Sequence, residues 1–128
     1  MKTRVKRIFN YSEESVDAII IKNSTEPFID DNFFYATGIN QGLFEGNVAV
    51  LYPDGNIDLI VSTLEEEIAF KSDADVKVFN NKDEYYNLLD ESLKNCSNIG
   101  VNYNTTLYKD FYNIREKFSK KNIPVTMP

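Results

Sequence analysis

Short runs of β-branched and other apolar residues recur along the chain, at lengths typical of strands. These runs predict buried strands because they leave no polar face for solvent, and they lie at 17–22, 47–52, 57–62, 75–79 and 98–102. The turn sequence "PDGN" (53–56) joins the second run to the third, so these two are expected to form a hairpin. Residues 123–127 predict an edge strand, since Pro124 has no N–H to donate to a ladder.

Apolar residues at helical spacing predict an amphipathic helix over 3–13. A second, short helix is expected through 32–36. Asp30 or Asp31 can cap its start, because a carboxylate accepts a hydrogen bond from a free N–H of the first turn. Gly38 is expected to end it, since glycine readily adopts the left-handed conformation that closes a helix.

Three further helices are expected between the later strands. The expected capping residues are Thr63 with Glu66, Asn81 with Glu84, and Thr105 or Thr106. The positions expected to face the core are Tyr85, Leu88, Leu89 and Leu93 in the second of these helices, and Tyr108, Phe111, Ile114 and Phe118 in the third. Helices that alternate with strands in this way cover both faces of a sheet.

The element order predicts a single α/β domain over residues 1–128. We expect three layers, α/β/α, around a mixed, mostly parallel sheet of five to six strands that contains one hairpin. A chain of 128 residues is long enough to close one hydrophobic core. A hairpin followed by alternating helices and strands is also typical of the ribonuclease H-like arrangement.

Charge and composition exclude several classes of function for this chain. The net charge is −6 and the basic residues form no long block, so nucleic acid is not an expected partner. The absence of histidine argues against Ser/His and Cys/His hydrolases and most catalytic zinc sites. One cysteine, Cys96, cannot form an internal disulfide and favours a cytoplasmic setting. The apolar runs are too short to span a bilayer.

The carboxylates are interpreted as caps and solvated faces rather than as a metal site. They occur as neighbours at 13–14, 30–31 and 65–67. Adjacent side chains point to opposite faces of a strand or fan apart on a helix, so they do not converge on an ion. A nuclease would need acids at strand centres, and those centres are apolar here.

The segment "GINQGLFEG" (38–46) has no period of its own. Its glycines recur every four residues without a basic neighbour, which argues against a phosphate-binding loop. Phe44 has two interpretations: an exposed side chain in contact with a partner or ligand, or a core side chain folded back onto the hairpin. The expected substrate- or partner-bordering residues are Asn40, Gln41, Phe44 and Glu45.

The sequences "DAIIIKNSTEPFIDDNFFYATGI" and "GNVAVLYPDGNIDLIVSTLEEEIA" resemble the N-terminal domain of the creatinase/prolidase family, the Xaa-Pro peptidases. That domain has a strand, then an asparagine and a tyrosine that lead to Thr-Gly, and then a hairpin. In this chain the motif residues are Asn32, Tyr35, Thr37 and Gly38. The loop 25–31 is longer than the family pattern.

The resemblance implies a ribonuclease H-like fold without nuclease chemistry. It places catalysis in a C-terminal pita-bread domain, which is absent from this chain. That domain binds two divalent metal ions and hydrolyses the bond before proline. This chain then carries no catalytic or metal-binding residue. The resemblance also implies a homodimer in which loops of this domain border the partner's active site. The alternatives are a stand-alone binding or assembly module and a ribonuclease H-like nuclease.

Overall fold

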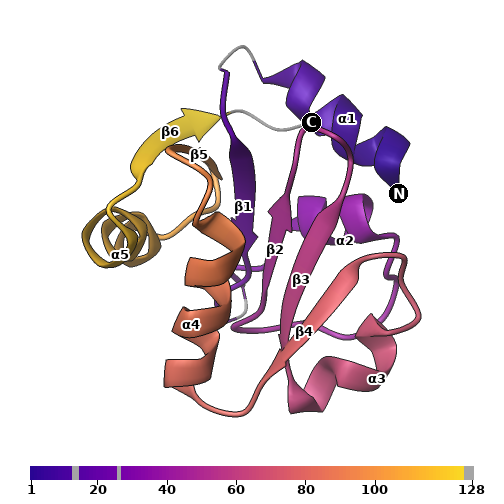
Figure 1. Cartoon of the computed structure of the whole chain (residues 1–128). Helices are drawn as coiled ribbons and strands as arrows, with labels where there is room; N and C mark the ends of the chain where they lie inside the picture. Colours follow the sequence, from indigo (N-terminus) through magenta and orange to yellow (C-terminus); the bar gives the residue numbers. More distant parts are fainter. Residues whose placement is uncertain (13–14, 26, 126–128) are drawn as a thin grey trace.

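The described residues form a six-stranded sheet between two helical layers (Figure 1). In this computed structural model they are 1–12, 15–25 and 27–125, with only the backbone of Phe111 included. The strands are β1 (Ala18–Lys22), β2 (Val48–Leu51), β3 (Ile57–Ser62), β4 (Asp75–Phe79), β5 (Asn98–Asn102) and β6 (Lys121–Val125). Their order is β4-β3-β2-β1-β5-β6.

The sheet is mixed and mostly parallel, as predicted. Among the described strands, β2 alone runs against the others: it pairs antiparallel with β1 and β3, while β3–β4, β1–β5 and β5–β6 are parallel. The turn between β2 and β3 closes with hydrogen bonds from Tyr52 N to Asn56 O and from Gly55 N to Tyr52 O. The hairpin expected from "PDGN" is therefore confirmed.

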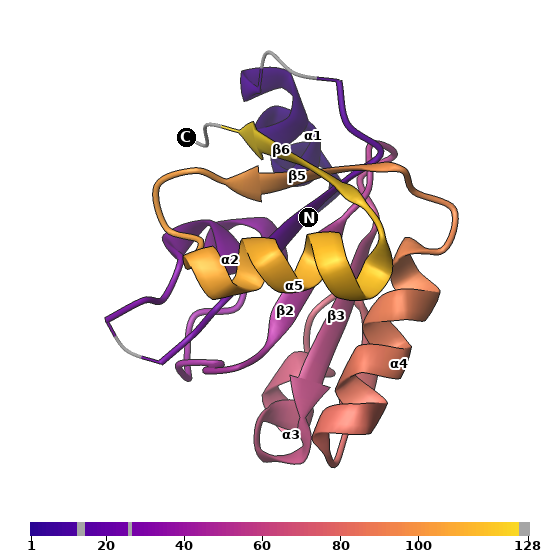
Figure 2. The same ribbon diagram turned by 90° about the vertical axis from the view of Figure 1, so that its left-hand side faces the viewer.

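Helices cover both faces of the sheet, with α1, α2 and α3 on one side and α4 and α5 on the other (Figures 1 and 2). Their bounds are α1 (Lys2–Tyr11), α2 (Asp31–Thr37), the 3-10 turn η1 (Thr63–Glu65), α3 (Glu66–Ala69), α4 (Lys82–Leu93) and α5 (Tyr108–Phe118). Each face has its own apolar cluster. Ile19 and Ile21 point into the cluster beneath α1 and α2, and Ile20 into the one beneath α4, because neighbouring strand residues alternate.

Two helices begin as the sequence predicts. The Asp30 side chain accepts from Asn32 N at the start of α2, and Gly38 ends that helix in the left-handed region at φ +76°. The Asn81 side chain accepts from Glu84 N at 2.9 Å, while Asn81 Nδ2 donates to Glu84 Oε1 at 3.0 Å. Both starts combine a short polar side chain with an extended backbone at the cap, the arrangement that satisfies the free N–H groups.

Two capping predictions are wrong. Thr63 lies inside η1 rather than before it, because the chain passes directly from β3 into the turn, and neither η1 nor α3 has a side-chain cap. The capping box with Glu66 is therefore not formed. Thr105 and Thr106 do not cap α5, which starts at Tyr108 after Leu107.

The inward face of α5 also differs from the prediction. Ile114 is buried and Phe118 is partly buried, as expected, but Tyr108 is 78% exposed. The helix starts later than predicted, so Tyr108 is its first residue, and most of its surface stays in contact with solvent. In α4, Tyr85, Leu89 and Leu93 are buried and Leu88 is partly buried, as expected.

The strand β6 lies at one edge of the sheet, as its proline predicts. The last two residues of the strand expected over 123–127, the side chain of Phe111 and the carboxylate pair at 13–14 lie outside the described residues.

Candidate functional site

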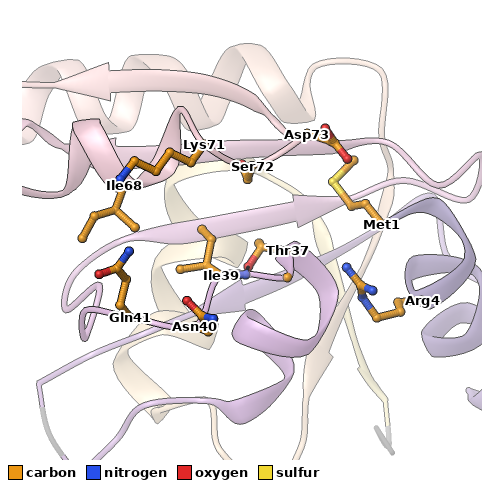
Figure 3. Close-up of a pocket in the computed structure, with 11 residues that line it drawn as sticks. Met1, Arg4, Thr37, Ile39, Asn40, Gln41, Ile68, Lys71, Ser72 and Asp73 are labelled. Atoms are coloured by element: carbon orange, nitrogen blue, oxygen red, sulfur yellow. Dashed lines mark hydrogen bonds between the residues drawn. The ribbon is translucent and has the colours of Figure 1, made fainter.

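A polar hollow lies on the face of the sheet that carries α1 and α2. It has a volume of about 290 Å³ and is lined by Met1, Arg4, Thr37, Gly38, Ile39, Asn40, Gln41, Ile68, Lys71, Ser72 and Asp73. Figure 3 shows that its side chains come from the start of α1, the end of α2 with its following loop, and the α3 region. The fold thus brings four of the sequence-predicted residues, at positions 37, 38, 40 and 41, to one place.

The Thr-Gly pair is built as a helix end. Thr37 is buried, its Oγ1 donates to Phe33 O at 2.9 Å, and it accepts from Ile39 N at 3.2 Å. Gly38 N donates to Phe34 O at 2.9 Å. The hydroxyl therefore bridges the last turn of α2 and the segment that leaves it, while the glycine supplies the reversal of direction.

Arg4, on α1, caps the same end of α2 with its side chain. Its Nε donates to Tyr35 O at 2.7 Å, which satisfies a carbonyl that has no partner within the last turn of α2. A cation is favourable here because carbonyl groups give a helix C-terminus a partial negative charge. The Tyr35 side chain itself is 37% exposed, and the Asn32 side chain donates to Asp30 Oδ1 at 3.0 Å. The motif residues at 32, 35, 37 and 38 thus supply hydrogen bonds and backbone geometry at the two ends of α2.

Phe44 is buried, so the expectation of an exposed aromatic at this position is wrong. It has no exposed surface, and its ring centroid lies 5.3 Å from that of Phe33 and 6.2 Å from that of Phe34. Its backbone is in the left-handed region at φ +53°. This turn sends the ring inward and leaves the neighbouring Leu43 48% exposed. The core interpretation of Phe44 is the one that the structure supports.

The rest of the loop faces outward. Asn40, Gln41 and Glu45 are exposed, and the first two line the hollow. A Cβ built on Gly42 would lie 3.1 Å from Glu65 Oε2, so the loop passes directly beside η1. The exposed polar side chains and Leu43 therefore form one surface. The buried ring of Phe44 anchors this loop to the core.

A buried polar network at the carboxyl ends of β1 and β5 was missed by the sequence analysis. Asn23 Oδ1 accepts from Asp30 N at 3.0 Å, and Asn23 Nδ2 donates to Leu43 O at 3.5 Å. Asp30 Oδ2 accepts from Asn102 Nδ2 and Thr105 Oγ1, each at 2.8 Å. Asn23, Asp30 and Asn102 are at most 3% exposed. The network ties the loop, the start of α2 and the segment before α5 to one another.

Replacing Asp30 by asparagine is expected to lower the free energy of unfolding by about 1–2 kcal/mol. One carboxylate oxygen would become an amide that faces the donors of Asn102 or Asn32, and a hydrogen bond to a charged acceptor would be lost. Urea unfolding of Asp30→Asn measures this loss. The matched control is the exposed neighbour Asp31→Asn, expected to change stability by less than about 0.5 kcal/mol. Equal effects of the two variants would contradict the importance of the network.

A partly buried group of titratable side chains also lies where β1 meets α4 and α5. Lys22 Nζ, at the end of β1, donates to Tyr85 Oη at 3.0 Å and lies 4.0 Å from Asp110 Oδ1. Burial lowers the pKa of the Lys22 amine, an effect that the Asp110 charge opposes. Burial raises the pKa of the Asp110 carboxyl, and Lys22 opposes that shift. The charged groups of Lys22 and Asp110 face each other, and Lys22 also bonds Tyr85. This arrangement is typical of a structural ion pair.

The described residues contain no cluster of three or more His, Cys, Asp or Glu side chains that could hold a metal ion. The hollow offers hydrogen-bonding groups and the charges of Arg4, Lys71 and Asp73, but among its lining residues no nucleophile is paired with a base.

Comparison with known protein families identifies the family of this chain. The profile of the Creatinase/Prolidase N-terminal domain matches residues 4–127. The chain belongs to this family. A comparison with curated proteins gives no match.

Solved structures share the fold of this creatinase/prolidase N-terminal domain. The prolidase from Pyrococcus furiosus is 27% identical, with a TM-score of 0.67, over 95% of this chain and 34% of that one. The Xaa-Pro dipeptidase from Bacillus anthracis is 16% identical, with a TM-score of 0.72, over 98% of this chain and 32% of that one. The chain thus spans about one third of the length of these relatives.

A third structure has the size of this chain. It is the creatinase/prolidase N-terminal domain of an X-Pro dipeptidase from Streptococcus pyogenes, 16% identical, with a TM-score of 0.68, over 95% of this chain and 98% of that one. A domain of this family was therefore crystallised on its own. In the present domain, none of the helices over the described ranges is long and apolar enough to cross a bilayer.

Proposed function

We propose that this chain is the non-catalytic N-terminal domain of an Xaa-Pro dipeptidase or aminopeptidase-like metallopeptidase. The observation that carries the proposal is the family match over residues 4–127. The similar folds of the prolidase from Pyrococcus furiosus and the Xaa-Pro dipeptidase from Bacillus anthracis support it. In the full-length protein, a C-terminal domain would hold two divalent metal ions and cleave the bond before proline.

The role proposed for this domain is dimerisation, with the loop 39–46 bordering the active site of the partner subunit. The exposed groups of that loop, Asn40, Gln41, Leu43 and Glu45, support this role because they combine polar and apolar contact surface. Leu64 of η1, the residue before Glu65, is 86% exposed and offers a further apolar side chain. Phe44 contributes by fixing the loop from within the core rather than by touching the partner.

The proposed compartment is the cytoplasm. Cys96, the chain's single cysteine, is a free and buried thiol. Burial raises the pKa of this thiol, which favours its protonated form. A protein without disulfides is typical of a reducing compartment.

Residues 1–128 alone are expected to hydrolyse no Xaa-Pro dipeptide, with manganese, cobalt or zinc added. The full-length protein, obtained by reading the coding sequence past Pro128, is expected to do so. The physical reason is that this chain has no histidine and that its described residues bring no carboxylates together around an ion.

Both proteins are assayed side by side, with a no-protein blank and after a second purification. Turnover by residues 1–128 that survives repurification would contradict the non-catalytic role. A reading frame that stops directly after Pro128 would instead favour a stand-alone binding or assembly module.

A further inference from the structure

An aromatic groove of about 280 Å³ lies between α5 and the edge strand β6, on the side of the sheet away from the polar hollow. Its surface is mainly apolar, and it is lined by Tyr103, Tyr108, Tyr112, Arg115, Asn122 and Pro124. We refer to these six residues as the tyrosine groove. The loop 39–46 contributes nothing to it.

The periodicities of the two elements place these side chains together. Tyr108, Tyr112 and Arg115 are spaced at four and three residues, so they share one face of α5. Asn122 and Pro124 are two apart on β6 and therefore point to the same side of the sheet. β6 is the outermost strand of the sheet, and α5 covers this side of it only in part.

The tyrosines are unusually accessible for aromatic residues. Tyr103 is 69% exposed, Tyr108 is 78% exposed and Tyr112 is 49% exposed. The Arg115 guanidinium lies 5.8 Å from the ring centroid of Tyr112, where it can stack on a partner as well. Tyrosine and arginine are among the residues enriched where protein surfaces bind each other, and a clustered apolar patch on a domain marks such a surface.

The path of the chain indicates what covers the groove. Tyr103 N donates to Val125 O at 3.0 Å, so the last described residue of β6 is bonded to a residue of the groove. Figure 2 shows the arrowhead of β6 and the start of α5 on the same side of the molecule. The polypeptide therefore leaves the described part of the fold beside the tyrosine groove.

The solved relatives are about three times as long as the part that this chain matches, and the matched part is the N-terminal domain. A domain that follows β6 is covalently tethered to the chain beside the groove, and each linker residue lets it move at most about 3.6 Å further. Such a tether gives the following domain a high effective concentration at the groove, which no free partner has.

We propose that the tyrosine groove is the docking surface for the C-terminal domain of the same polypeptide. This inference rests on the proposed function, because it requires that a C-terminal domain follows. The groove then fixes the orientation of the two domains, while the loop 39–46, at a separate place on the domain, remains available for the partner subunit.

The test compares the full-length protein with residues 1–128 by nitration of tyrosines with tetranitromethane and mass spectrometry. In the full-length protein, nitration of Tyr103, Tyr108 and Tyr112 is expected to be about tenfold slower than in the fragment. Tyr11 on α1 is 54% exposed and serves as the internal control, with equal rates in both proteins. Far-UV circular dichroism establishes that the fragment is folded.

A variant with a weakened groove provides a second, independent test of the same contact. The double change Tyr108→Ser and Tyr112→Ser in the full-length protein is expected to speed proteolysis between the two domains about tenfold, because the docked state is less populated. The matched control is Tyr11→Ser, which should leave the rate unchanged.

Each outcome bears on the proposal. Protection in the full-length protein with faster proteolysis of the double variant supports it. An active Xaa-Pro peptidase whose groove tyrosines are nitrated as fast as in the fragment overturns the docking surface and leaves the proposed function standing. Protection that rises with the concentration of the fragment identifies a second copy as the occupant and overturns the proposal. A reading frame without a following domain overturns both.

Discussion

Truncation of Phe44 to alanine is expected to lower the free energy of unfolding by about 3–5 kcal/mol. The side chain has no exposed surface and packs against the rings of Phe33 and Phe34, so its removal leaves a cavity that the rigid core cannot fill. Urea unfolding of Phe44→Ala, followed by circular dichroism, measures the loss. It is the largest effect that we expect from a single change in this domain.

The control is its neighbour Leu43→Ala. Leu43 is 48% exposed on the same loop, and we expect a loss below about 1 kcal/mol. In the full-length protein the order should reverse for catalysis, with Leu43→Ala raising KM and Phe44→Ala leaving kinetics unaltered in the molecules that stay folded. Near-normal stability of Phe44→Ala would show that the aromatic ring is not part of the core.

Gly38→Val is expected to destabilise the domain by about 1–3 kcal/mol or more. Gly38 has φ +76°, a conformation that a β-branched side chain adopts only with strain. A Cβ at this position would also lie 2.7 Å from Nη2 of Arg4 and would disturb the guanidinium that closes α2. The urea unfolding midpoint gives the measurement.

Two controls separate the causes. Gly38→Asn introduces a Cβ that also meets Arg4, but asparagine tolerates the left-handed region, so a smaller loss indicates that backbone strain dominates. Glu66→Ala should cost less than about 0.5 kcal/mol, because α3 has no side-chain cap to lose. If Glu66→Ala proved more harmful than Gly38→Val, the end of α2 would not be as described.

The parts of the fold that the sequence predicts well are those fixed by local chemistry. α2 is an example: Asp30 marks its start and Gly38 its end, and both act within a few residues. The hairpin at 53–56 and the Asn81 cap of α4 follow from the same kind of signal. The alternation of apolar runs and helices then limits the topologies of the sheet to a few.

The features that could not be predicted depend on distant partners. The loop 39–46 has no period, so nothing in its sequence says whether Phe44 turns inward or outward. The buried network joins Asp30 to Asn102, 72 positions away, and neither residue reveals the other. Thr105 offered a plausible helix cap, yet its hydroxyl serves Asp30 instead. A short polar side chain can satisfy either a local or a remote partner, and only the assembled sheet decides between them.

The position of β1 in the sheet has a consequence for how the chain folds. Its antiparallel neighbour β2 follows within a few dozen residues, but its parallel neighbour β5 pairs Ala18 with Ile99. During synthesis, the strand sequence AIIIK therefore keeps one unpaired edge until most of the domain has been made. Such an apolar edge is a template for wrong pairing with other chains. Asp17 accepts from Ser97 N and Asn98 N at the start of the β1–β5 pairing, so closure of that edge also fixes its register.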